Sequence, residues 1–170
     1  SSGSATGEPP RTRTGPASRA YLYYGDEQLL HDDTNCGADT DNRPMMTAWD
    51  LDTPIARDIG VLSRVRRENP AVQRGYHQPR WLDPDTYVFE RAWGESVCLA
   101  AFHRGGGRTV GPLLTTLPDG EHACVLTGRT VRVEGGRIGE LALGADDVLV
   151  LSHAVAEPPP AWPNALRPRR

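Results

Sequence analysis

The feature that most limits the fold of this chain is a series of short apolar runs that fills its second half. The runs are separated by turn residues such as Asp119-Gly120 and Gly135-Gly136. Strands that recur about every ten residues, with turn signals between them, are typical of a small β-sandwich. The first two runs flank Trp93-Gly94-Glu95, which predicts a hairpin. The expected strands cover residues 86–91, 96–102, 109–114, 123–126, 130–133, 138–143 and 148–151.

One amphipathic helix is expected before these strands. Thr53 is a suitable N-cap, and Pro54 suits the first helical position because an N–H there has no partner within the helix. Apolar residues then recur at helical spacing on one face, at Ile55, Ile59, Leu62 and Val65. Asn69-Pro70 ends the helix, since a residue before proline avoids helical backbone angles. The change of period places a boundary near residue 70.

The segment before the helix has a different composition. Residues 20–24 form a continuous aromatic and apolar run, which suits a strand buried on both faces. A loop rich in Asp and Asn follows over residues 31–46. We therefore expect four parts: a disordered arm or linker over 1–18, a strand, loop and helix over 19–70, a β-sandwich domain over 71–155, and a Pro-rich tail over 156–170.

Length and charge remove several classes of protein. The chain has 170 residues, too few for a complete (β/α)8 barrel of about 200–250 residues. It contains no Lys, so it has neither a Schiff-base lysine nor a Walker lysine. A net charge of −3 argues against nucleic acid as a partner. No apolar run approaches the ~18 residues of a membrane span, no signal peptide is recognised, and the localisation stays open.

The polar loop at residues 32–43 is the densest candidate for ligand binding. Its oxygen-rich side chains suit calcium, but their spacing does not fit the EF-hand register. We interpret it as a solvated loop, with a ligand-binding loop and a metal site as alternatives. The chain is expected to hold no cofactor and no metal.

For several other residues a catalytic or binding role is compared with a structural one. Asp26 and Glu27 are adjacent, so on a strand they point to opposite faces and do not converge as a catalytic pair. Residues 104–108 are expected to be a hairpin loop rather than a phosphate loop. An odd number of cysteines is no disulfide framework, although a Cys98–Cys124 bridge is an alternative to free thiols. The histidines expected at surface or edge positions are His77, His103, His122 and His153.

Several stretches, taken in order, carry a family resemblance. They begin with Tyr23-Tyr24-Gly25-Asp26-Glu27-Gln28 and continue over residues 39–46, 62–72, 80–82, 87–91 and 97–102. Together they resemble the C-terminal part of a family-13 glycoside hydrolase, nearest to the α-amylase and cyclodextrin glucanotransferase branch. The likeness covers about residues 20–153. It implies a mostly β fold: an antiparallel Greek-key β-sandwich, the α-amylase C domain, preceded by the last strand and helix of a (β/α)8 barrel.

The resemblance also implies the site residues. Asp39 and Arg43 match a pair that hydrogen-bonds a glucose unit in the substrate cleft, while a salt bridge within the loop is the alternative. The family's nucleophile, acid/base and third carboxylate lie upstream of the Tyr-Tyr-Gly strand, so no catalytic residue is assigned. His31-Asp32 mimics the third motif but follows the strand instead of preceding it.

The expected function is that of a C-terminal fragment of an α-glucan-active enzyme, without catalysis of its own. Its implied partners are an α-glucan in the parent enzyme and the missing barrel portion. A stand-alone carbohydrate-binding or partner-binding module, and one half of a split enzyme, are the alternatives. Under the binding-module alternative, four aromatic residues offer faces to sugar rings, although burial in the core is favoured for them: Tyr76, Trp81, Tyr87 and Trp93.

Overall fold

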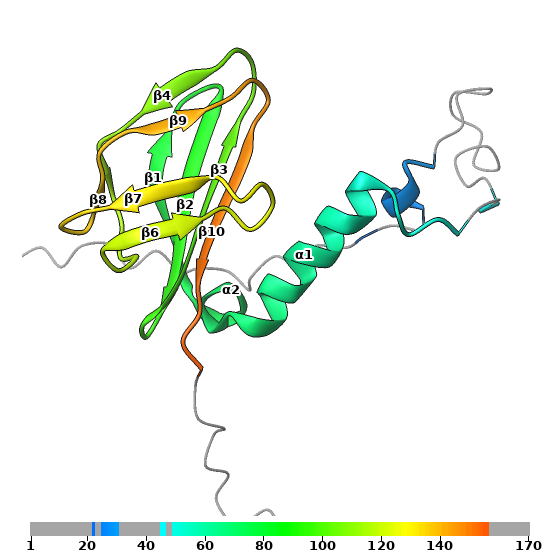
Figure 1. Cartoon of the computed structure of the whole chain (residues 1–170), viewed down its shortest axis with the longest axis horizontal. Coiled ribbons are helices and arrows are strands. Elements are labelled where there is room, and N and C mark those ends of the chain that lie inside the picture. The colour runs from blue at the N-terminus through cyan, green and yellow to red at the C-terminus, as the bar shows by residue number, and fades with distance from the viewer. Residues whose placement is uncertain (1–21, 23–24, 31–44, 47–48, 157–170) are drawn as a thin grey trace, which may run out of the picture.

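Two layers of antiparallel strands lie between residues 76 and 153 in the computed structural model, which describes residues 22, 25–30, 45–46 and 49–156 (Figure 1). The first layer is a four-stranded sheet in the order β1-β2-β3-β10. Its strands are β1 (Tyr76–Leu82), β2 (Thr86–Trp93), β3 (Ser96–His103) and β10 (Val148–His153). This confirms a mostly β, antiparallel fold.

The second layer consists of three strand pairs rather than one continuous sheet. These are β4 (Arg108–Val110) with β9 (Leu141–Leu143), β5 (Leu113–Leu114) with β8 (Arg137–Ile138), and β6 (Gly120–Ala123) with β7 (Thr130–Val133). The predicted hairpin is confirmed: Trp93 pairs with Ser96 around Gly94, whose φ of 55° lies in the left-handed region that favours glycine.

The sequence-based prediction omitted one strand and misassigned one connection. Strand β1 was not expected, because Pro79 interrupts its pattern; a proline is tolerated there because β1 is an edge strand. Residues 104–108 do not form a hairpin loop. They lead from β3 in the first layer to β4, which pairs with β9 in the second layer.

The predicted helix is α1 (Pro54–Glu68), and its cap is as expected. The Thr53 hydroxyl oxygen accepts a hydrogen bond from the Ala56 N–H at 3.1 Å. A second, short helix that the pattern did not reveal, α2 (Pro70–Arg74), follows at once, and Asn69 caps it by accepting from the Ala71 N–H at 2.8 Å. None of the α1 residues is fully buried, and Leu62 of the predicted apolar face is exposed.

Most of the expected N-terminal strand lies outside the described residues. Leu22, which is described, is exposed and belongs to neither a helix nor a strand. A short 3₁₀ helix, η1 (Asp26–Gln28), follows Gly25. The arm at 1–18 and the tail from residue 157 also lie outside the described residues.

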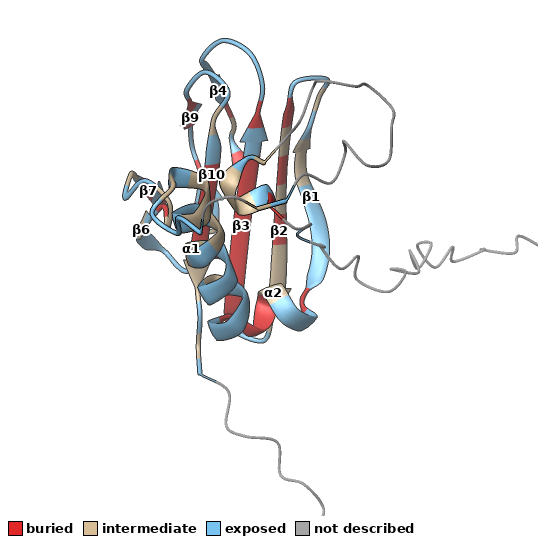
Figure 2. Ribbon diagram, turned by 90° about the vertical axis from the view of Figure 1, so that its right-hand side faces the viewer, coloured by how far each residue is buried: buried red, intermediate tan, exposed pale blue. Residues whose placement is uncertain are grey.

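The core lies between the two layers, and a smaller cluster lies on the other face of the first sheet (Figure 2). In that smaller cluster, Cys98, Ala100 and Val150 pack against Val65 of α1 and Val72 of α2. Strand β3 is therefore covered on both faces along most of its length. Cys98 belongs to this cluster and Cys124 to the main core; both are free thiols, so the alternative bridge between them does not form. The main core consists of Val88, Val97, Leu99, Ala101, Val110, Leu113, Leu117, Cys124, Val131, Val133, Ile138, Leu141, Leu143, Leu149 and Leu151.

Candidate functional site

The sequence-predicted sugar-binding pair, Asp39 and Arg43, lies outside the described residues, as do His31, Asp32 and Cys36. The described flanks of that loop nevertheless lie together. The side-chain amide of Gln28 donates to the Met46 sulfur at 3.6 Å, which joins the two ends of the loop. The Thr53 hydroxyl donates to the Glu27 carbonyl at 2.8 Å and so fixes η1 to the start of α1. Asp26 and Glu27 lie on η1 rather than on a strand.

Among the histidines, His103 is buried, so the expectation of a surface or edge position is wrong for this residue. Its Nδ1 lies 2.9 Å from the Thr86 hydroxyl and 3.2 Å from the Asp85 carbonyl oxygen. Its Nε2 lies 2.5 Å from the Gly106 carbonyl oxygen. The ring thus fastens the β3–β4 connection to the start of β2. The signal missed in the sequence is that His103 continues the inward-facing alternation of β3.

Among the described carboxylates the most buried is Glu90, whose side chain is 1% exposed and whose two oxygens both accept hydrogen bonds. Arg80 pairs with it at 2.7 Å, and Thr115 and Thr116 donate through both hydroxyls and the Thr116 N–H. Burial alone would raise the pKa of Glu90, but these hydrogen bonds outweigh burial and place the pKa below its usual value. The cluster is a structural network between β1, β2 and the segment after β5, although the buried Nε of Arg80 has no hydrogen-bond partner among the described residues.

Three turn aspartates also have lowered pKa values. A hydrogen bond from the Trp81 indole is the largest cause at Asp83, and N–H groups of Gly136 and Gly135 lower the pKa of Asp119. At Asp147, burial raises the pKa, while the Gly144 N–H and Arg129 lower it by more. A general acid at a glycosidase site needs a raised pKa instead. The four carboxyl groups with resolved shifts in the described part of the chain thus all have lowered pKa values, and none has the raised pKa of a general acid.

Aromatic rings gather on the outer face of the first sheet. His77 stacks on Phe89 with ring centroids 4.5 Å apart, and Phe89 stacks with Phe102 at 6.0 Å. Of the four residues weighed for sugar stacking, Tyr76 is 67% exposed, contrary to the core expectation. Trp81, Tyr87 and Trp93 are half-buried; Trp81 packs against the core and its indole N–H donates to Asp83 at 2.6 Å.

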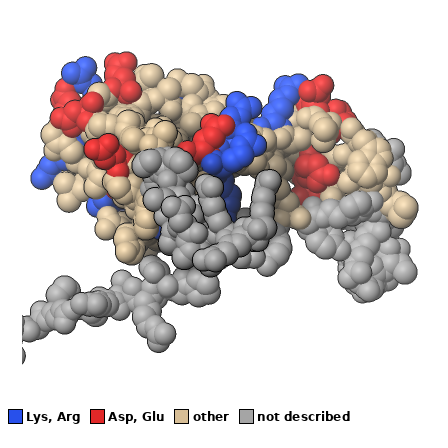
Figure 3. Space-filling view, turned by 90° about the horizontal axis from the view of Figure 1, so that it is seen from below, with Lys and Arg blue, Asp and Glu red and all other residues tan. Residues whose placement is uncertain are grey.

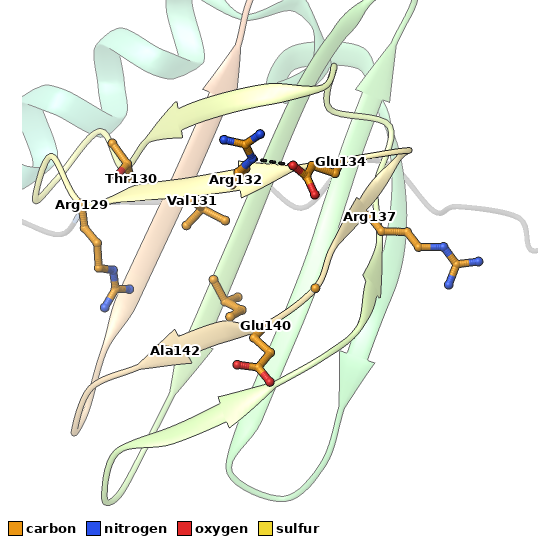
Figure 4. Close-up of a pocket in the computed structure, with 10 residues that line it drawn as sticks. Arg129, Thr130, Val131, Arg132, Glu134, Arg137, Glu140 and Ala142 are labelled. Atoms are coloured by element: carbon orange, nitrogen blue, oxygen red, sulfur yellow. Dashed lines mark hydrogen bonds and ion pairs between the residues drawn. The ribbon is translucent and has the colours of Figure 1, made fainter.

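A cavity of about 420 Å³ lies in the second layer between β7 and β9 (Figure 4). Strand β7 pairs with β6 and β9 pairs with β4, so the two strands that face each other across this gap are not hydrogen-bonded to one another. Its walls combine Arg129, Arg132, Glu134 and Glu140 with the apolar residues Val131, Leu141 and Ala142.

Metal binding, surface charge and membrane-spanning helices account for three further findings. Within the described ranges, no group of three or more His, Cys, Asp or Glu side chains could hold a metal ion. On the face seen in Figure 3, arginines and acidic residues are interspersed rather than gathered into one basic field. None of the described helices is long and apolar enough to cross a membrane.

Known proteins resemble this chain over only part of their length. The chain matches no family model. It is 34% identical over 145 residues to the cyclomaltodextrin glucanotransferase of Bacillus licheniformis, a match that covers 82% of this chain and 20% of the relative. The chain thus spans about a fifth of the length of the curated relatives it matches.

Solved structures show the same partial match. CldA, described as a cyclomaltodextrin glucanotransferase with a three-domain ABC distribution, superposes with a TM-score of 0.73 at 36% identity, over 79% of this chain and 29% of that one. The α-amylase of Geobacillus thermoleovorans, solved with acarbose, shares the fold with a TM-score of 0.60 at 23% identity, over 76% of this chain and 28% of that one. The chain is therefore homologous, over a stretch of about a fifth of the curated relatives' length, to cyclomaltodextrin glucanotransferases, and it shares the fold of a portion of an α-amylase.

Proposed function

We propose that this chain is the C-terminal portion of an α-glucan-active family-13 enzyme and that it has no catalytic activity alone. The observation that carries the proposal is the partial match: 82% of this chain corresponds to only 20% of a cyclomaltodextrin glucanotransferase. The resemblance puts the nucleophile, the acid/base and the third carboxylate of such enzymes upstream of the matched stretch. In the whole enzyme, a retaining mechanism through a covalent glycosyl-enzyme is expected.

The carboxylates of the described residues support the absence of catalysis. Those with displaced pKa values are Asp83, Glu90, Asp119 and Asp147, and each is displaced downward by hydrogen bonds that stabilise turns or the core. Glycoside hydrolysis needs one carboxyl group that stays protonated near neutral pH. These four side chains are better explained as structural anions.

The exposed apolar residues before residue 70 support a missing partner portion. Trp49 is 78% exposed and Met45 is 81% exposed, and α1 has no fully buried residue. The sandwich, in contrast, has a complete core of its own. Apolar surface gathered in one region of a chain marks a contact surface. We assign that surface to the preceding barrel of the parent enzyme; it comprises Leu22, Leu29, Met45, Trp49, Leu51 and Leu62.

Incubation of the purified chain with starch and maltooligosaccharides tests the lack of catalysis. We expect no reducing sugar and no cyclodextrin above a mock preparation. Release of either product in proportion to the added chain would refute that part of the proposal.

Complementation tests the contact surface. The part of a cyclomaltodextrin glucanotransferase that precedes the matched stretch, produced on its own, should co-purify with this chain. Replacing Trp49 and Leu51 together with Ala should weaken co-purification, because both are exposed apolar residues of the proposed surface. Leu114→Ala is the matched control, since Leu114 is equally apolar and 55% exposed but belongs to the sandwich. Equal capture of all variants would contradict the assigned surface.

A further inference from the structure

A row of four apolar residues crosses the outer face of the first sheet. Leu82 of β1 lies opposite Tyr87 of β2, and Tyr87 lies opposite Phe102 of β3. Phe102 in turn lies opposite Val148 of β10, and residues directly opposite one another share a face of the sheet. Leu82, Phe102 and Val148 are exposed, and Tyr87 is half-buried. A groove of about 470 Å³ lies along these four residues, which we call the apolar row.

The neighbouring row on the same face is covered by helices. It lies two residues away on each strand, where Ala100 of β3 is opposite Val150 of β10. Both residues belong to the cluster that packs against Val65 of α1 and Val72 of α2. Figure 2 shows these helices over the end of the sheet at which β3 begins. Among the described residues this helical cover ends before the apolar row, because the exposed fraction rises from 6% at Ala100 to 45% at Phe102.

The aromatic rings of the apolar row are held in place by their neighbours. Phe102 stacks with Phe89 at a centroid distance of 6.0 Å, and Phe89 lies 5.4 Å from the ring of Tyr87. The Tyr87 hydroxyl forms a hydrogen bond with Nε2 of His77. Rings that are already ordered lose little side-chain entropy when a partner binds. Aromatic residues are also enriched in the buried centres of protein interfaces. The apolar row therefore has the properties of a preorganised contact surface.

The charges around the groove favour an apolar protein surface as the partner. Asp83 and Asp147, which line the groove, are already paired with arginines at 2.8 Å and 2.9 Å. The exposed charges of the lining, Asp85 and Arg104, have opposite signs. Neither a polyanion nor a polycation is favoured by such a rim, because each would meet a charge of its own sign. Binding at the groove thus depends on its apolar residues, with the charges as a polar border.

We infer that the apolar row is a second contact surface for the barrel portion of the parent enzyme. This inference rests on the proposed function, which assigns the apolar residues before residue 70 to the same partner. The two surfaces are continuous, because α1 packs beside the apolar row through Val65 and carries the exposed Leu62 one turn earlier. The outer ring of a (β/α)8 barrel consists of helices, so the surface that meets the row is an apolar helix face. It would cover Phe102 in the way that α1 and α2 cover Ala100.

Binding of the full chain to the separately produced barrel portion of a cyclomaltodextrin glucanotransferase tests the inference. Phe102→Ser should weaken binding at least about tenfold and Leu82→Ser at least about threefold, because each removes exposed apolar area from the contact. Leu114→Ser is the matched control, since Leu114 is an exposed leucine of the second layer, and it should leave binding unchanged. In a Cys36→Ser background, Phe102→Cys should react with iodoacetamide in the free chain and be protected in the complex. Leu114→Cys should react equally in both.

Two results would overturn the inference: both serine variants bind the barrel portion as tightly as wild type, or position 102 reacts equally in the free and the bound chain. A dimer of the free chain that protects position 102, while the barrel portion does not, would assign the row to a second copy instead. If Phe102→Ser does not fold, Leu82→Ser and the labelling of Leu82→Cys decide. The proposed function survives if the serine variants bind normally while replacement of Trp49 and Leu51 abolishes binding. Loss of binding by wild type itself would refute both contact surfaces.

Discussion

The side-chain amide nitrogen of Asn69 donates a hydrogen bond to the backbone carbonyl of Val97 at 3.0 Å, which joins the end of α1 to the start of β3. The same nitrogen lies 2.9 Å from the Ser152 hydroxyl and 3.3 Å from the His153 carbonyl oxygen, at the end of β10. Asn69 is fully buried. One side chain therefore holds both helices against two neighbouring strands.

Replacement of Asn69 with Ala is expected to destabilise the protein by about 2–3 kcal/mol, because a buried carbonyl and the Ala71 N–H lose their partners. Urea unfolding followed by tryptophan fluorescence measures the change. Gln73→Ala is the control: its amide bonds the Arg66 and Arg67 carbonyls at the exposed helix end, so its loss should cost less. Equal costs for the two variants would contradict the role assigned to Asn69.

Glu90 predicts how stability depends on pH. Its pKa in the folded protein lies below the ordinary value of 4.5, so folding favours the ionised form. The contribution of Glu90 is fully present above about pH 4.5 and is lost as the pH falls through the lower folded-state pKa. Glu90→Gln should cost about 2–4 kcal/mol at pH 7, because the largely buried Arg80 loses its counter-charge.

The measurement for Glu90 is the free energy of unfolding at several pH values from neutral to acidic. The wild type should lose more stability than Glu90→Gln over the acidic range. Glu95→Gln, at the exposed hairpin turn, should follow the wild-type curve. Parallel curves for wild type and Glu90→Gln would show that Glu90 is not the group responsible.

The buried thiols should resist alkylation in the folded protein. Burial raises the pKa of Cys98 to about 11, so its thiolate is scarce at neutral pH. Burial also raises the pKa of Cys124, but hydrogen bonds from Thr127 and the Val150 N–H lower it by more. Cys124 is only 2% exposed, so access limits its reaction instead.

Mass spectrometry of a Cys36→Ser variant after iodoacetamide treatment measures this resistance. We expect no labelling at pH 8 without denaturant and two labels after unfolding in guanidinium chloride. Before labelling, the mass of the intact protein should be that of two free thiols, because a disulfide would remove their hydrogens. Rapid labelling of either thiol in the folded state would contradict the burial described above.

Replacement of two glycines with alanine should change the stability of the protein in opposite directions. A methyl group on Gly75 would lie 2.4 Å from the Ala71 carbonyl oxygen and 2.8 Å from that of Ala92, so Gly75→Ala should cost about 3 kcal/mol or more. A methyl group on Gly60, inside α1, meets nothing within 4 Å. Gly60→Ala should stabilise the helix by about 0.5–1 kcal/mol. Thermal unfolding by circular dichroism separates the two, and the same sign for both would contradict this packing.

The sequence predicted those helices, strands and turns whose signals lie in neighbouring residues. The Thr53-Pro54 start of α1, the hairpin around Gly94 and the strand expected over residues 86–91 depend on neighbouring residues, and each is present. Strand β1 escaped prediction because it contains a proline that is tolerated only at the edge position that the sheet gives it. Helix α2 escaped prediction because its five residues are too few to show a helical period, although Asn69 caps it locally.

The candidate sites likewise divide into one that the sequence indicates and one that only the folded structure reveals. The resemblance pointed to Asp39 and Arg43, which stay a prediction because they lie outside the described residues. The cavity beside Arg129 has no linear signature. Its walls come from β7, the following turn and β9, and β7 and β9 are brought face to face only by the folded second layer.

The amide of Asn69 has a consequence for where this protein can be shortened. A version beginning at residue 71, where the strand pattern starts, would lose the donor that holds the ends of β3 and β10 together. It would also uncover Cys98, Ala100 and Val150 where Val65 now packs over them. The smallest self-sufficient sandwich must therefore carry the last turns of α1 with it, so the point at which the periodicity changes is not a point at which the polypeptide can be cut.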